Sequence, residues 1–201
     1  MKKIMISAML MLLTITATAQ DNTWEQPQAN STENPDQKYL AGAVPEVNGH
    51  VVFEAVLPAP GKTAAEVYSI MHSQLAALTK EPGQFEQSRL ALEDAEGGHL
   101  VGSYQEWLVF KNKPLVLDRT RMLYHLFVDC ADGQATLRMT RITYLYDEER
   151  EPQTYYAEEW ITDKYGLNKK KDKLSRVSGK FRRKTIDRKD YLIRKFTEAL
   201  R

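Results

Sequence analysis

Cysteine is nearly absent from this chain, and so are long apolar segments beyond its amino terminus. Cys130 is the single cysteine among 201 residues, which excludes an internal disulfide, since a disulfide needs two. No later apolar run approaches the roughly 20 residues of a transmembrane helix. The chain also lacks the spacings typical of zinc sites, nucleotide loops and catalytic motifs. We therefore expect stability from a packed core, and no catalytic residue, metal or cofactor.

What the amino terminus does have is the order of a secretory signal peptide. Lys2 and Lys3 precede an apolar run over residues 4–15, and a stretch of small residues ends at Ala19. This order predicts a signal peptide over residues 1–19, cleaved after Ala19. We expect an exported protein, periplasmic or extracellular, with no transmembrane segment after processing. No cysteine follows the cleavage site directly, so a lipoprotein is not expected.

Residues 20–47 are polar, contain three prolines and show no apolar period. Such a composition does not offset the entropy lost on ordering, so it predicts a flexible polar leader in which Trp24 is exposed. Residues 48–200 have the length of one domain.

Charge is divided between two blocks. Residues 20–162 hold 11 basic and 22 acidic residues, a net charge of −11, whereas residues 163–201 hold 15 basic and 5 acidic residues, a net charge of +10. The second block contains the strongest functional candidate in the sequence.

The pattern of apolar residues predicts a mixed α and β domain. A strand begins at His50, and a capping box of Thr63 and Glu66 starts a helix that Glu81-Pro-Gly83 ends. Four antiparallel strands follow, over residues 89–93, 99–110, 119–130 and 135–146. A shift of the apolar phase predicts a β-bulge near Thr140 and Arg141.

The rest of the chain predicts one short element and a final helix. We expect a short helix or strand over residues 155–161, a basic connector at about 163–185, and a helix over about 187–200 capped by Asp187.

This element order is that of the TATA-box-binding protein (TBP) fold. The chain resembles a family of secreted bacterial domains of unknown function with this TBP-like fold, over roughly residues 48–200. The residues that carry the resemblance are Val51-Val-Phe53, the helix with Glu66, Val67 and Tyr68, and Arg183-Lys-Thr-Ile-Asp187. The resemblance implies an α+β fold, a curved five-stranded antiparallel sheet with two helices on one face. It implies no catalytic or ligand-binding residue.

The basic segment places eleven cations within 21 residues: Lys169, Lys170, Lys171, Lys173, Arg176, Lys180, Arg182, Arg183, Lys184, Arg188 and Lys189. Clustered cations attract phosphates. Nucleic acid is nevertheless disfavoured, because an exported protein rarely meets it and a shared fold does not transfer function. Two alternatives stay open: binding of an envelope protein or an anionic envelope component, and neutralisation by the protein's own acidic body. The near cancellation of −11 by +10 favours the latter.

Aromatic residues form a second candidate surface near Tyr155, Tyr156 and Trp160, because such side chains line protein and carbohydrate sites as well as cores. The predicted binding residues are therefore Lys180, Arg182, Arg183, Lys184, Arg188, Tyr155, Tyr156 and Trp160.

The remaining reactive residues point to no site of their own. The four histidines are scattered over three strands and a helix, and His125 and Asp129 are too far apart along one strand for direct contact. Cys130 is predicted to be a core residue. The acidic residues at 147–149 and 151 lack the glycine and spacing of a calcium loop, which predicts a solvated turn.

Two functional hypotheses follow. The first is a non-enzymatic envelope module that binds through the open face of the sheet or the basic segment. The alternative is a small periplasmic hydrolase whose site is assembled in space, with His125 as its candidate.

Overall fold

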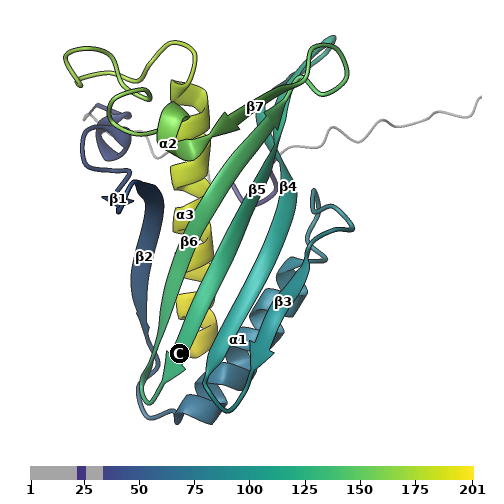
Figure 1. Ribbon diagram of the computed structural model, residues 1–201, viewed down its shortest axis with the longest axis vertical. Coiled ribbons are helices and arrows are strands. Elements are labelled where there is room, and N and C mark those ends of the chain that lie inside the picture. The colour runs from purple at the N-terminus through teal and green to yellow at the C-terminus, as the bar shows by residue number, and fades with distance from the viewer. Residues whose placement is uncertain (1–21, 26–33) are drawn as a thin grey trace, which may run out of the picture.

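One antiparallel sheet organises the protein, with both long helices on the same face (Figure 1). The computed structural model describes residues 22–25 and 34–201; the predicted signal peptide and part of the predicted leader lie outside the described residues. The strands are β1 (Glu46–Val47), β2 (His50–Pro58), β3 (Arg89–Asp94), β4 (His99–Lys113), β5 (Val116–Ala131), β6 (Gln134–Tyr146) and β7 (Gln153–Tyr156). The helices are the 3-10 turn η1 (Gln37–Tyr39), α1 (Ala64–Leu78), α2 (Ala157–Trp160) and α3 (Gly179–Leu200).

The strands run in the order β1-β2-β6-β5-β4-β3, and β7 pairs with β6. The predicted α+β class and the order of strand, helix, four strands and helix are confirmed. The sheet is larger than the five strands expected, because β1 and β7 extend it. These two strands have two and four residues, too short for an alternating pattern to be detected in the sequence.

The core lies between the sheet and the two helices. Successive strand residues point to opposite faces, so Met122, Tyr124 and Leu126 of β5 are fully buried against the helical layer. The capping box at Thr63 is present, and α1 buries one stripe of apolar side chains: Val67, Met71, Leu75 and Leu78. Cys130 packs against this core, as predicted.

A β-bulge divides the outer edge of β6 between two partners. Residues 134–140 pair with β2, residues 143–146 pair with β7, and β5 occupies the opposite edge. Between the two segments the register with β5 shifts by one residue, and Arg141 has a left-handed backbone with φ of 54°. The bulge predicted near Thr140 and Arg141 is therefore confirmed.

Helix α3 begins eight residues earlier than predicted, at Gly179 rather than after Asp187. Its buried face includes Phe181, Arg182 and Arg188. Arginine is almost never fully buried unless it is paired, so the sequence pattern did not assign either arginine to the buried face. Because Arg182 lies on the first two turns, those turns were not recognised as helix.

The predicted flexible leader, with Trp24 exposed, is wrong for the part of it that the structure describes. Trp24, Tyr39 and Val44 are buried in the main core. The Asn22 side chain donates to the carbonyl of Val109 at 2.7 Å and accepts from its N–H at 2.9 Å. A few anchoring side chains thus order a segment whose average composition predicts flexibility.

No helix among the described residues combines the length and apolar character needed to cross a bilayer.

We predict that Tyr39→Ala lowers the free energy of unfolding by about 3–5 kcal/mol, the cost of removing a large buried aromatic side chain. Urea denaturation of the processed chain measures this loss. Gln37→Ala, two residues before Tyr39 and exposed, is the matched control and should change stability by less than about 0.5 kcal/mol. Equal, small effects of both substitutions would contradict the burial of Tyr39 and support a flexible leader.

Candidate functional site

Arg182, one of the predicted binding residues, lies inside the protein. Its side chain is fully buried, and its guanidinium donates to the carbonyls of Tyr39, Leu40 and Ile161 at 2.6–2.7 Å. It also pairs with Asp163 at 2.7 Å. Burial lowers the pKa of Arg182, and Asp163 opposes that shift. This residue ties two separate segments, around residues 39–40 and 161–163, to α3.

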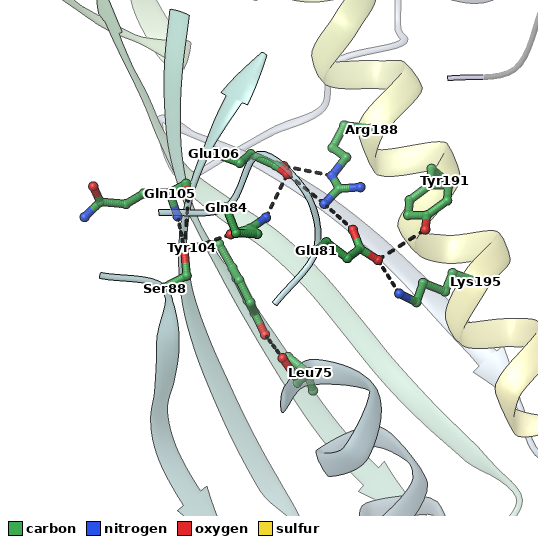
Figure 2. Close-up of polar contacts among 10 residues, drawn as sticks. All are labelled: Leu75, Glu81, Gln84, Ser88, Tyr104, Gln105, Glu106, Arg188, Tyr191 and Lys195. Carbon is green, nitrogen blue, oxygen red and sulfur yellow. Dashed lines mark hydrogen bonds and ion pairs between the residues drawn. The ribbon is translucent and has the colours of Figure 1, made fainter. Parts of the chain in front are cut away.

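Arg188, also predicted to bind, occupies a second buried network (Figure 2). Its Nε donates to Oε1 of Glu106 at 2.8 Å and one terminal nitrogen donates to Oε2 at 2.7 Å, a bidentate pair. The same nitrogen reaches Glu81 at 3.1 Å. Arg188 and Glu106 have side-chain exposures of 0% and 2%. The pair therefore joins α3 to the centre of β4, away from solvent.

Two carboxylates of this network have opposite pKa shifts. Burial raises the pKa of Glu106, against the influence of Arg188. Burial also opposes ionisation of Glu81, but Arg188 and Lys195 outweigh it and hold the pKa of Glu81 below its usual value. Tyr191 donates to Glu81 as well, at 3.2 Å, which adds to its stabilisation as an anion.

The other predicted cations of α3 pair with acids of the body. Lys180 contacts Asp118 at 2.7 Å, Arg183 pairs with Asp36, and Lys184 pairs with Glu25. The structure therefore differs from the expected basic binding surface on this helix. These cations pair with acids of the acidic block, since Asp118, Asp36 and Glu25 all lie outside α3.

The aromatic candidates are divided between the core and the surface. Tyr155 and Trp160 stack with ring centroids 3.8 Å apart, and Phe181 packs edge-on against both. Tyr156, in contrast, is 55% exposed. The first two rings thus support the α2 region, and only Tyr156 presents an open aromatic surface.

The cations that precede α3 are arranged differently. We name residues 167–176 the basic loop; it projects from the upper end of the molecule in Figure 1. Its exposed cations are Lys169, Lys170, Lys171, Lys173 and Arg176. Within the part of the chain that the structure describes, no ion pair joins any of them to an acid.

Asn168 gives the basic loop a defined shape. Its side-chain oxygen accepts from the N–H groups of Asp172 and Lys173, at 3.1 and 3.3 Å, and its amide donates to Asp172 at 2.7 Å. Leu167 and Leu174 pair across the base of the loop as an isolated antiparallel bridge. The single acid of the loop, Asp172, is therefore hydrogen-bonded to Asn168, while the cations of the loop are exposed.

The sequence located these lysines but grouped them in one basic connector with Lys180, Arg182, Arg183 and Lys184, which lie on α3. The Asn168-to-Asp172 spacing is the signal that would have found the loop, because Asn side chains often close local turns by bonding to nearby backbone groups. The earlier start of α3 completes the separation, since the helix ends the loop at Gly179.

The open face of the sheet carries mixed charge and no dominant sign. His99 lies 2.8 Å from Asp129, which also pairs with Arg138, and all three side chains are partly exposed. On the same face Arg141 lies over the ring of Phe127. The groups of this face therefore largely satisfy one another.

A cleft of about 270 Å³ lies beside this face, where Trp107 and Tyr146 contribute to its lining. Its lining residues include no histidine. The guanidinium of Arg119 lies 3.7 Å from the centre of the Trp107 ring, so the protein's own cation occupies the aromatic surface.

Groups that would serve a hydrolase are not collected in that cleft. Burial, with Arg141 and Arg89, lowers the pKa of His125. Burial raises the pKa of the Cys130 thiol to about 11, which keeps it protonated and weakly nucleophilic at neutral pH. Among the described residues, no three His, Cys, Asp or Glu side chains gather as a metal site requires.

Comparison with known proteins identifies relatives by family and by fold. The model of a domain of unknown function with TBP-like fold, DUF4468, matches residues 53–145. A DUF4468 family protein from Bacteroides ovatus, whose crystal structure is known, has 40% sequence identity to this chain. The two structures match with a TM-score of 0.77 over 84% of this chain and 96% of that one. A TBP-like protein from Parabacteroides distasonis is 17% identical, with a TM-score of 0.61 and coverage of 78% and 96%, a likeness of fold. No curated protein matches.

We predict that Arg188→Met costs about 3–5 kcal/mol of stability, because it leaves Glu106 buried without its counter-ion. Adding Glu106→Gln should recover part of that loss, which urea denaturation of both single variants and the double variant measures as a coupling energy. Arg194→Met, on the exposed side of the same helix, is the control and should stay within about 0.5 kcal/mol. Additive single effects would contradict a coupled pair.

Proposed function

This chain belongs to the DUF4468 family, and from that premise we propose that it is a non-enzymatic binding module that holds an anionic partner through the basic loop. The observation that carries the proposal is the separation of the basic block into two parts. The cations of α3 pair with the body, whereas those of the loop face solvent. The proposal includes the predicted export, which makes the partner a component of the cell envelope.

The charge of the basic loop suits a ligand with several anionic groups. Its five cations are accompanied by one acid, Asp172, and that acid is bonded to Asn168. Phosphates spaced along a surface or polymer would each meet a lysine or arginine and release counterions on binding. A single small anion would engage only a fraction of this charge.

The internal hydrogen bonds of the loop support the same proposal. Binding normally costs conformational entropy when a mobile segment is fixed. Asn168 and the bridge between Leu167 and Leu174 already hold the backbone, so less of that cost remains for the ligand. The lysine side chains keep their freedom, which favours recognition of charge over recognition of one exact shape.

We predict that Lys169→Glu/Lys170→Glu/Lys171→Glu weakens binding of inorganic polyphosphate by at least about ten-fold, because three counterion-releasing contacts become repulsive. For the wild-type processed chain, affinity should fall about 100-fold between about 50 and 200 mM salt if four cations contact phosphate. Titration calorimetry at both salt concentrations measures these changes.

The matched control is Lys80→Glu/Arg89→Glu/Arg194→Glu, which makes the same change in net charge at exposed positions outside the basic loop. It should retain most of the wild-type affinity. Equal losses in the two triple variants would indicate attraction to net charge alone and would contradict a site at the loop. Substitutions of Arg182 are unsuitable here, because that side chain is buried.

A further inference from the structure

The tip of the β4–β5 hairpin exposes three consecutive apolar residues. Leu115 is fully exposed, and Val116 and Leu117 are 44% and 52% exposed. Lys111 and Lys113, exposed on the preceding strand, flank them. Leu115 also has a left-handed backbone, with φ of 65°, which a branched side chain adopts only at a cost. Folding alone gives no reason to place leucine at this position.

This hairpin tip and the basic loop lie at the same end of the molecule. In Figure 1 both project at the top of the long axis, the loop between α2 and α3 on the left and the hairpin on the right, while the carboxyl terminus lies near the bottom. A flat surface placed across that end would meet both. One contact would be basic and the other apolar with flanking lysines.

The acidic turn between β6 and β7 lies at the same end and is the main argument against an anionic surface. Three of its four acids pair with arginines, however: Asp147 with Arg150 at 2.9 Å, Glu148 with Arg121 at 2.7 Å, and Glu149 with Arg119 at 3.5 Å. Glu151 is exposed and forms no ion pair with the described residues. The sequence predicted a solvated turn, and most of its acids are also paired. The cations of the basic loop and of the hairpin therefore outnumber the one unpaired acid of this turn.

We propose that this end of the molecule docks on an anionic lipid surface, with the side chains of Leu115, Val116 and Leu117 entering the headgroup region while the basic loop contacts lipid phosphates. The inference rests on the proposed function, because the loop supplies most of the charge. Cations near such a surface contribute about five-fold each to partitioning, and inserted apolar side chains add the hydrophobic part.

A lipid surface fits the apolar tip better than a protein partner does. Leu115 lies in the projecting turn, Val116 and Leu117 begin β5 beside it, and Leu117 also contributes to the lining of the cleft near Trp107. Three such residues do not supply the extended complementary area that protein interfaces need. A fluid interface accepts a narrow apolar projection without such complementarity. Lysines beside inserted apolar groups are the usual arrangement at that depth, since their long side chains reach the headgroups.

The test is co-sedimentation of the processed chain, residues 20–201, with phosphatidylcholine vesicles that contain or lack phosphatidylglycerol, beside titration with polyphosphate. We expect binding only to vesicles with phosphatidylglycerol. Leu115→Ser/Val116→Ser/Leu117→Ser should reduce that partitioning at least about ten-fold, as expected for loss of three inserted side chains, while polyphosphate affinity stays unchanged.

The control variant is Val47→Ser/Val56→Ser/Leu92→Ser, which removes three comparably exposed apolar residues from other parts of the sheet and should bind vesicles as the wild type does. Wild-type binding to polyphosphate without binding to vesicles would overturn the lipid inference and leave the proposed function intact. Vesicle binding by the hairpin variant at the wild-type level would also overturn it. Binding to neither probe would defeat both proposals.

Discussion

Two guanidinium groups on the buried face of α3 must be paired inside the protein, and the rest of the structure depends on how they are satisfied. Arg188 is matched by carboxylates from β4 and from the segment after α1. Arg182 is matched chiefly by backbone carbonyls of residues 39, 40 and 161. An uncompensated buried charge would cost several kcal/mol, so these two side chains fix where η1, α2 and the α1–β3 connection lie relative to the last helix.

Much of the sheet could be predicted from the sequence because its signals are local. Alternation along β5, the capping box at Thr63 and the phase shift at Arg141 each appear within a few residues, and the structure has all three. Helix α3 and the leader could not be predicted in the same way. The start of the helix was missed because the burial of Arg182 depends on a carbonyl about 140 residues away in sequence. The leader was missed because the fixed position of Tyr39 depends on a contact at similar range.

The same limit applies to the candidate site. The sequence shows one basic block, and its net charge nearly cancels that of the remaining chain. Only the structure divides this block at Gly179, with mostly paired cations after that residue and the exposed loop before it. The prediction of self-neutralisation describes the helix, and the prediction of an anionic partner now concerns a different set of lysines from the one first chosen.

The contacts of Arg182 and Asp187 also determine when this protein can fold. Tyr39 bonds to Asp187 across 148 residues, and Arg182 bonds to Tyr39 across 143. Contacts of such long range close late and slow the folding of a domain. A chain emerging from the ribosome therefore lacks the helix that completes its core until α3 has been synthesised, about 140 residues after Tyr39.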